Sequence, residues 1–130
     1  MAEDNIQIGD KMTDGTIYAG ISPDTKEAMY VTAKDAGLIT TFNQAKKCAS
    51  KLDAHGHKDW RLPTEAELNV LFKNREKGAL KGAFNLKSEN GAGYYWSSKR
   101  AYIILGSGLS FSDGQYYYIR NALTSVRCVR

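Results

Sequence analysis

The sequence predicts a single domain of the α+β class, in which helices and strands occupy separate blocks of the chain. Three observations support this class. Residues 16–32 have the pattern of a β-hairpin, residues 42–75 carry two stretches of helical periodicity, and residues 94–129 hold several short strand-like runs. Separate blocks of this kind favour an α+β domain over a parallel, doubly wound sheet.

Length and composition agree with one soluble globular domain. The chain has 130 residues, of which 42% are hydrophobic and 25% charged. We expect a flexible N-terminal segment over residues 1–13 and one domain over residues 14–130. No apolar run approaches the roughly 20 residues that a membrane helix needs. Residues 1–5 are polar and acidic, unlike a signal peptide, so we expect a cytoplasmic protein or an exported one whose leader was removed.

The first predicted element is the hairpin. Residues 16–21 and residues 28–32 read as its two strands, because both runs are rich in apolar and β-branched residues. Between them, Ser22, Pro23 and Asp24 supply turn chemistry.

The first predicted helix follows the hairpin. Thr40 or Thr41 can cap its start, and Gly56 can end it. One face is apolar, because residues recur at helical spacing at Phe42, Ala45, Cys48, Ala49 and Leu52.

The second predicted helix begins after Pro63 and runs to about Arg75. Proline disfavours helical geometry in the residue before it, which keeps Leu62 extended. Thr64 can accept the amide of Glu67, and the Glu67 carboxylate can reach back to the Thr64 amide. The sequence therefore predicts a capping box at this junction.

The last block reads as short antiparallel strands. Residues 94–98, 102–105, 115–120 and 125–129 are the strand candidates. Residues 112–114 carry a Ser-Asp-Gly turn signal.

Four short motifs occur in a fixed order: DWRLPTEAEL at 59–68, YWSS at 95–98, FSDG at 111–114 and VRCVR at 126–130. Together they resemble the bacterial domain family typified by the C-terminal domain of the Lcl collagen-like adhesin, over roughly residues 14–130. The resemblance implies a C-type-lectin-like fold, related to the formylglycine-generating-enzyme-like group. Some relatives in that fold group are the variable proteins of diversity-generating retroelements.

The resemblance also implies roles for individual residues. Trp60 and Trp96 would be core residues. Arg61 and Arg127 would hold the scaffold together through backbone or carboxylate contacts. The calcium-binding triplets of sugar-binding lectins are absent from the sequence, so we do not expect calcium-dependent sugar recognition.

The sequence contains two cysteines, Cys48 and Cys128. One reading is a pair of buried, reduced thiols; the other is a disulfide between the first helix and the last strand, and the redox compartment decides between them. The resemblance implies that the two thiols are neighbours and leaves their oxidation open. A catalytic thiol is the least favoured reading, because no histidine is tied to either cysteine by a motif.

Enzymatic activity is not expected. His55, His57 and Asp59 could hold zinc or copper, but histidines near a helix C-terminus are favourable for electrostatic reasons alone. We therefore expect no metal and no cofactor. Phosphate loops, nucleophile elbows and paired-carboxylate motifs are also absent from the sequence. The alternative is a metal- or thiol-dependent oxidase of the formylglycine-generating type, which would need two neighbouring active-site cysteines.

The region from Tyr94 to Asn121 is rich in Tyr, Ser, Gly and Asn, as antibody paratopes are. We expect an exposed surface here, with Tyr116 and Tyr118 on one strand face and Tyr117 on the other, core-facing side. The alternative is ordinary, half-buried strand tyrosines. The predicted ligand-binding residues are Lys99, Arg100, Tyr102, Ile104, Tyr116, Tyr118, Arg120 and Asn121.

These observations predict a non-enzymatic ligand-binding module. Its sharper form is a retroelement-diversified protein that binds another protein. The alternative is an adhesin-like module that binds anionic polysaccharide through Lys99, Arg100 and Arg120. The net charge of +4 does not by itself indicate a nucleic-acid partner. We expect no nucleic-acid binding and no membrane insertion, and the oligomeric state is open.

Overall fold

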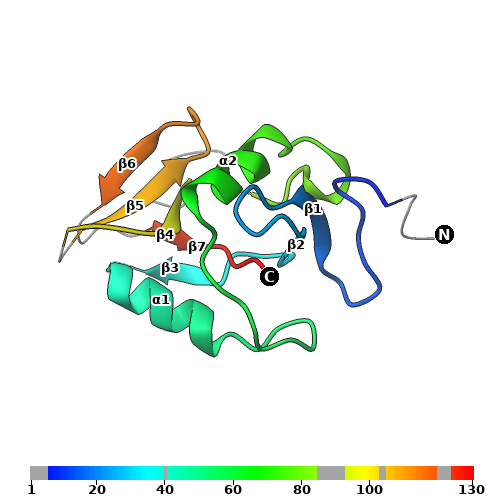
Figure 1. The fold of residues 1–130 in the computed structure, drawn as a ribbon, viewed down its shortest axis with the longest axis horizontal. Helices are drawn as coiled ribbons and strands as arrows, with labels where there is room; N and C mark the ends of the chain where they lie inside the picture. Colours follow the sequence, from blue (N-terminus) through cyan, green and yellow to red (C-terminus); the bar gives the residue numbers. More distant parts are fainter. Residues whose placement is uncertain (1–5, 40, 85–92, 103–104, 120–123) are drawn as a thin grey trace.

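The computed structural model describes residues 6–39, 41–84, 93–102, 105–119 and 124–130 (Figure 1). The chain is an α+β protein, as predicted. Among the residues described, no helix has the length and apolar character to cross a membrane. The elements are β1 (Ile17–Ile21), β2 (Ala28–Val31), β3 (Gly37–Ile39), α1 (Phe42–Lys51), α2 (Glu65–Lys73), the 3-10 helix η2 (Gly78–Leu80), β4 (Tyr94–Tyr102), β5 (Leu105–Ser110), β6 (Tyr116–Ile119) and β7 (Thr124–Val126).

Five strands form the main sheet, in the order β3-β7-β4-β5-β6. Every pairing is antiparallel except the contact between β4 and β7, where Tyr95 lies opposite Ser125 in parallel orientation. The predicted hairpin is confirmed as a separate two-stranded sheet of β1 and β2. The C-terminus joins the hairpin to the rest of the molecule, because Tyr30 and Arg130 exchange two backbone hydrogen bonds.

The strand prediction is wrong around residues 102–110. We expected a separate strand over residues 102–105, but β4 continues to Tyr102 and a new strand, β5, begins at Leu105. Glycine is depleted in strands, which hides β5 in the sequence. Here the glycines have a packing reason: a Cβ on Gly106 would approach the Phe42 ring to 2.6 Å and the Trp96 ring to 2.7 Å.

Both helices have the predicted caps. The Thr41 hydroxyl accepts the Gln44 amide at the start of α1, and the capping box of Thr64 and Glu67 is complete at the start of α2. The predicted end of α1 is wrong. The helix ends at Lys51, well before Gly56, because Leu52 turns to extended geometry and donates its amide to the Ala49 carbonyl.

The N-terminal segment meets the hairpin in residues 6–13, part of the stretch that we predict to be flexible. The Gly9 amide donates to the Tyr18 carbonyl at 2.8 Å, and the Gly9 carbonyl accepts the Ala79 amide at 2.7 Å. Its flexibility stays a prediction.

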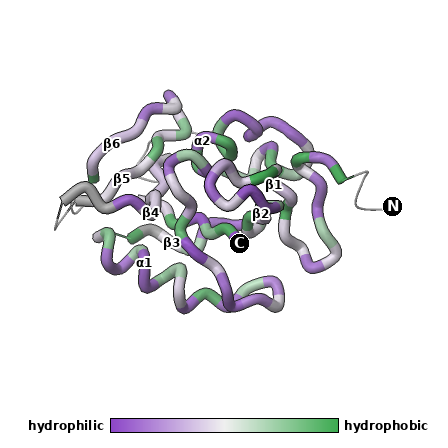
Figure 2. The backbone as a smooth tube through the Cα atoms, in the orientation of Figure 1, coloured by the Kyte–Doolittle hydropathy of each residue, from purple (hydrophilic) through white to green (hydrophobic). Residues whose placement is uncertain are grey.

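Two hydrophobic clusters cover the two faces of the main sheet. Tyr95 and Leu109 pack with α2 and the hairpin, whereas Trp96 and Val126 pack with α1. Figure 2 shows hydrophilic and hydrophobic residues alternating along α1, as expected for a helix with one buried face. Trp60 and Trp96 are 3% and 0% exposed, which confirms their core assignment.

Candidate functional site

Three consecutive tyrosines lie on the outermost strand of the main sheet. Among the described strands, β6 pairs with β5 alone and forms the outer edge of the sheet (Figure 1). Tyr116, Tyr117 and Tyr118 are 42%, 40% and 66% exposed, whereas Ile119 is buried. These rings are the largest exposed aromatic side chains among the described residues. We call Lys99, Tyr116, Tyr117 and Tyr118 the aromatic surface.

The tyrosines alternate across the sheet. The Tyr116 hydroxyl contacts α2, and Tyr118, two residues further, lies on the same face. Tyr117 points to the α1 side, where its ring meets Tyr94 edge-on at 5.5 Å. The predicted sharing of one face by Tyr116 and Tyr118 is confirmed. The expectation that Tyr117 faces core is wrong, since the edge strand extends beyond the helices and leaves both faces accessible.

Glu65 holds this surface together, and sequence reasoning missed it. It is the first residue of α2, where a negative charge is favourable. Its carboxylate accepts the Ser107 hydroxyl and lies 3.6 Å from the Lys99 ammonium group. Its backbone carbonyl accepts the Tyr116 hydroxyl at 2.6 Å. The only signal in the sequence was an acidic residue in the first helical turn.

The structure brings three of the predicted binding residues together. Lys99 and Tyr116 both contact Glu65. Tyr118 lies opposite Ser107, whose hydroxyl also contacts Glu65. Arg100 and Tyr102 are placed by their backbones only, in β4 beside β5. The remaining predicted residues lie outside the described part of the chain: Ile104, Arg120 and Asn121.

The serines and glycines of β5 do not belong to the surface. The Tyr-, Ser-, Gly- and Asn-rich region from Tyr94 to Asn121 includes Gly106, Ser107, Gly108 and Ser110. All four are buried, because β5 lies between β4 and β6 and helices cover both of its faces. These four residues therefore contribute to the composition of the region but not to its exposed surface.

The aromatic surface carries little net charge. Partial burial and the neighbouring Glu65 charge raise the pKa of Tyr116. The hydrogen bond to Asp113 raises the pKa of Tyr117. Both hydroxyls are therefore neutral at physiological pH, and the charge of Lys99 is offset by Glu65. The surface offers aromatic area and hydroxyl groups.

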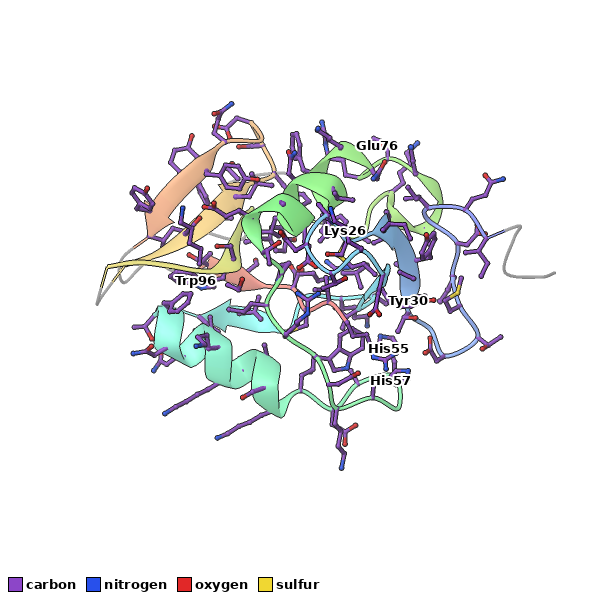
Figure 3. The ribbon with its side chains drawn as sticks, viewed as in Figure 1. Lys26, Tyr30, His55, His57, Glu76 and Trp96 are labelled. Carbon is purple, nitrogen blue, oxygen red and sulfur yellow. The ribbon has the colours of Figure 1, made fainter. Side chains whose placement is uncertain are left out.

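A second polar cluster contains the histidines. His57 Nε2 lies 2.8 Å from the Asp14 carboxylate, and His55 Nδ1 lies 3.0 Å from the Asp14 carbonyl (Figure 3). Arg130 holds Asp59 by two hydrogen bonds of 2.6 and 3.0 Å. Two hydrogen bonds from Thr16, with the contact to His57, lower the pKa of Asp14. Among the described residues, no group of three or more His, Cys, Asp or Glu side chains is arranged to hold a metal ion.

Two arginine–carboxylate contacts support the scaffold, as the resemblance implied. Arg61 donates two hydrogen bonds to the Glu67 carboxylate, at 2.6 and 2.8 Å. The fully buried Arg127 donates to Asp35 at 2.8 Å, and its guanidinium lies 4.5 Å from the centre of the Phe84 ring. Neither arginine is part of the aromatic surface.

The two cysteines belong to one hydrophobic cluster, and the structure has them in the reduced form. Cys48 is half-buried on α1, and Cys128 is buried near the C-terminus. Burial, reinforced by the neighbouring Cys48, raises the pKa of Cys128 to about 12. Burial also raises the pKa of Cys48. A disulfide between them stays a prediction.

These raised pKa values predict slow thiol chemistry in the native reduced protein. At pH 7.5 iodoacetamide should label Cys48 slowly and Cys128 more slowly still, because the thiolate is the reactive form. Unfolding in guanidinium chloride should make both thiols react fast, as a time course followed by mass spectrometry would show. Labelling of native Cys128 as fast as that of the unfolded chain would contradict this expectation.

The comparison with protein families identifies the family of the chain. The family model of the Lcl C-terminal domain matches residues 12–130, which is nearly the whole chain. No curated protein matches the chain significantly. The chain therefore belongs to the Lcl C-terminal domain family, a family of adhesin-like, ligand-binding modules.

Proposed function

We propose that the domain is a non-enzymatic binding module whose ligand is another protein, bound at the aromatic surface. The observation that carries this proposal is the run of three tyrosines on β6, each at least 40% exposed. Tyrosine is one of the residues that dominate binding energy in protein interfaces. Its ring brings a large, rigid contact area at a low entropic cost, and its hydroxyl brings a hydrogen-bonding group.

Tyr118 is the centre of the proposed contact. Its side chain is 66% exposed. Its hydroxyl forms no hydrogen bond with any residue that the structure describes, in contrast to Tyr116 and Tyr117, whose hydroxyls bind Glu65 and Asp113. The two anchored rings would orient the ligand-facing surface, and Tyr118 would supply a solvent-exposed hydroxyl group that can bind the ligand in place of water.

Judged from the side chains that the structure describes, a protein ligand fits this surface better than an anionic polysaccharide does. Sulfate and carboxylate groups are recognised by free cations, and the Lys99 ammonium group lies 3.6 Å from Glu65. Anionic polysaccharide is the second candidate. Retention on immobilised heparin that weakens steeply with salt, as expected for exposed charges, would favour it.

We further propose that the segment of about residues 99–121, which contains β6, is diversified by a retroelement. The exposed side chains of β6 lie outside both hydrophobic clusters, so they can vary without loss of the core. A reverse-transcriptase gene beside the coding sequence, with a near-copy of its 3′ end that differs mainly at adenines, would support diversification. A single invariant sequence among close relatives would contradict it.

The proposal predicts that binding and folding can be separated. Replacing Lys99, Tyr116 and Tyr118 together by serine should change stability by only about 0.5 kcal/mol per site, because these side chains are exposed. The same variant should lose the partner, since exposed aromatic anchors dominate such contacts. The measurements are thermal melting and affinity capture from the surface and secreted proteins of neighbouring cells, each captured protein being retested in purified form.

Ile21→Ser is a matched control, because Ile21 is a large apolar residue, 55% exposed, on the separate hairpin sheet. It should keep every partner that the wild-type protein captures. If the triple variant fails to fold, the three residues belong to the core and the site is wrong. If it folds and still binds, the ligand lies elsewhere, and the loop of residues 55–59 becomes the next candidate.

A further inference from the structure

The backbone of β6 has a free hydrogen-bonding edge. In an antiparallel pair, residues that exchange hydrogen bonds alternate with residues that do not. The Ser110 amide donates to the Gln115 carbonyl at 2.9 Å, which fixes the phase of this alternation between β5 and β6. Counting along the register, Tyr117 and Ile119 are the next residues whose backbones face β5.

The intervening residues, Tyr116 and Tyr118, therefore direct their backbone N–H and C=O groups away from β5. Among the described residues, no strand of the sheet lies beyond them, and Figure 1 shows β6 at the outer edge of the main sheet. The most exposed side chain of β6 and its outward-facing backbone groups thus belong to the same residue, Tyr118.

This edge is short, since β6 has four residues, but it lacks three other common protections against pairing. Edge strands commonly carry a lysine, a proline or a bulge that prevents another strand from docking. The sequence of β6, Tyr-Tyr-Tyr-Ile, has no charge and no proline, and its register with β5 is continuous. The opposite edge strand, β3, has only three residues.

We propose that a second copy of this chain pairs antiparallel with β6, about a two-fold axis at Tyr117. This register places Tyr116 opposite the partner's Tyr118 and Tyr118 opposite the partner's Tyr116. Each such pair exchanges two backbone hydrogen bonds, which gives about four in total. A two-fold axis makes the strand its own complement, and paired aromatic side chains stabilise neighbouring strands.

The lack of charge on β6 makes a second copy of this chain a suitable partner for this edge. The protein carries a net charge of +4, so two copies repel each other over most orientations. The four residues of β6 are uncharged, and Lys99 beside them is offset by Glu65. The β6 edge is thus a place where two copies meet without like charges in direct opposition.

The size of the contact predicts weak association. With the exposed fractions of the three tyrosines and roughly 200 Å² for each ring, their accessible area is on the order of 300 Å² per copy. Stable complexes bury about 1,200–2,000 Å² in total. We therefore expect a monomer at low micromolar concentration and a dimer in the range of hundreds of micromolar.

The test is sedimentation velocity over a concentration series from about 10 µM to about 1 mM, the range of weak complexes. Tyr118→Pro removes the outward N–H group without removing a bond to β5, since proline is tolerated where an edge N–H faces solvent. Tyr118→Val is the matched control, because it also lacks the ring but keeps the N–H group. The wild-type and Tyr118→Val proteins should dimerise, the latter several-fold more weakly, and Tyr118→Pro should stay monomeric.

A second variant covers the case in which the proline variant does not fold. Tyr118→Lys keeps an exposed side chain at an exposed position and introduces like charges near the axis. It should be monomeric at low salt and recover some dimer at high salt. Amide hydrogen exchange gives the site-specific readout: protection at Tyr116 and Tyr118 should rise with concentration, while Tyr117 is protected throughout.

A wild-type protein that is still monomeric at about 1 mM would overturn the proposal, because its dissociation constant would then exceed that of even weak specific complexes. A Tyr118→Pro dimer as stable as that of Tyr118→Val would also overturn it, as would a dimer without added protection at Tyr116 and Tyr118. None of these results depends on the proposed protein ligand, because the assay contains this chain alone.

Discussion

Replacing Trp96 by alanine should lower the free energy of unfolding by about 3–5 kcal/mol. The side chain is fully buried, and its indole N–H donates to the Ile39 carbonyl at 3.0 Å. The ring meets Phe42 of α1 edge-on at 6.3 Å and lies against the bare backbone of Gly106. Trp96 thus joins β3, α1 and β5, and alanine would leave a cavity where these elements meet.

The measurement is urea unfolding followed by circular dichroism. Tyr117→Ala is a suitable control, because it removes an aromatic ring from the same sheet face at a position 40% exposed, and it should cost less than about 1 kcal/mol. If Trp96→Ala lowers the free energy of unfolding no more than Tyr117→Ala does, the indole does not organise this half of the core.

Local sequence signals predicted the elements that depend on local contacts. The caps of both helices follow from side chains within three residues of each other, as in Thr64 and Glu67. The hairpin follows from a turn between two apolar runs. These features need no knowledge of distant residues, and the structure confirms them.

Strands β3 and β5 depend on distant partners, so the sequence did not reveal them. β3 has three residues and pairs with β7, more than eighty residues further along the chain. In β5, Gly106 and Gly108 look like a flexible loop, yet each leaves room for a neighbouring side chain. Strand propensity describes fit to a surrounding surface, which only the tertiary structure defines.

The candidate site also has a part that local sequence predicts and a part that depends on distant residues. The period of two in a strand was enough to place Tyr116 and Tyr118 on one face. The role of Glu65 was not predictable, because it contacts Ser107 and Tyr116 across 42 and 51 residues of sequence. In the sequence, Glu65 was identified only as part of the DWRLPTEAEL motif, with no role of its own.

Replacing Arg61 by methionine should cost about 2–3 kcal/mol of stability at pH 7. Its partner Glu67 is fully buried and would be left as an uncompensated charge, for which losses of about 3–5 kcal/mol are typical. The Arg61 side chain is 39% exposed, so water can replace part of its contribution, and the lower figure applies. Lys58→Met, in an exposed ion pair with Asp53, is the control and should cost no more than about 0.5 kcal/mol.

The same substitution should change how stability depends on pH. Burial alone would raise the pKa of Glu67, but hydrogen bonds from Arg61, Ser22 and the Thr64 amide outweigh it and hold the pKa at about 2. A carboxyl group whose pKa is lower in the folded state than its ordinary value of 4.5 stabilises the fold above that value. This contribution is lost as the pH falls from about 4.5 towards 2.

In Arg61→Met the burial remains and the strongest opposing hydrogen bonds are gone, so the pKa of Glu67 should rise. The folded protein then binds the Glu67 proton more readily than in the wild type, and the acid-induced loss of stability from this group should shrink or reverse. Urea unfolding at several pH values between about 3 and 7, the range in which carboxyl groups titrate, measures this slope directly. An unchanged slope in Arg61→Met, with Lys58→Met as reference, would show that Arg61 does not set the ionisation of Glu67.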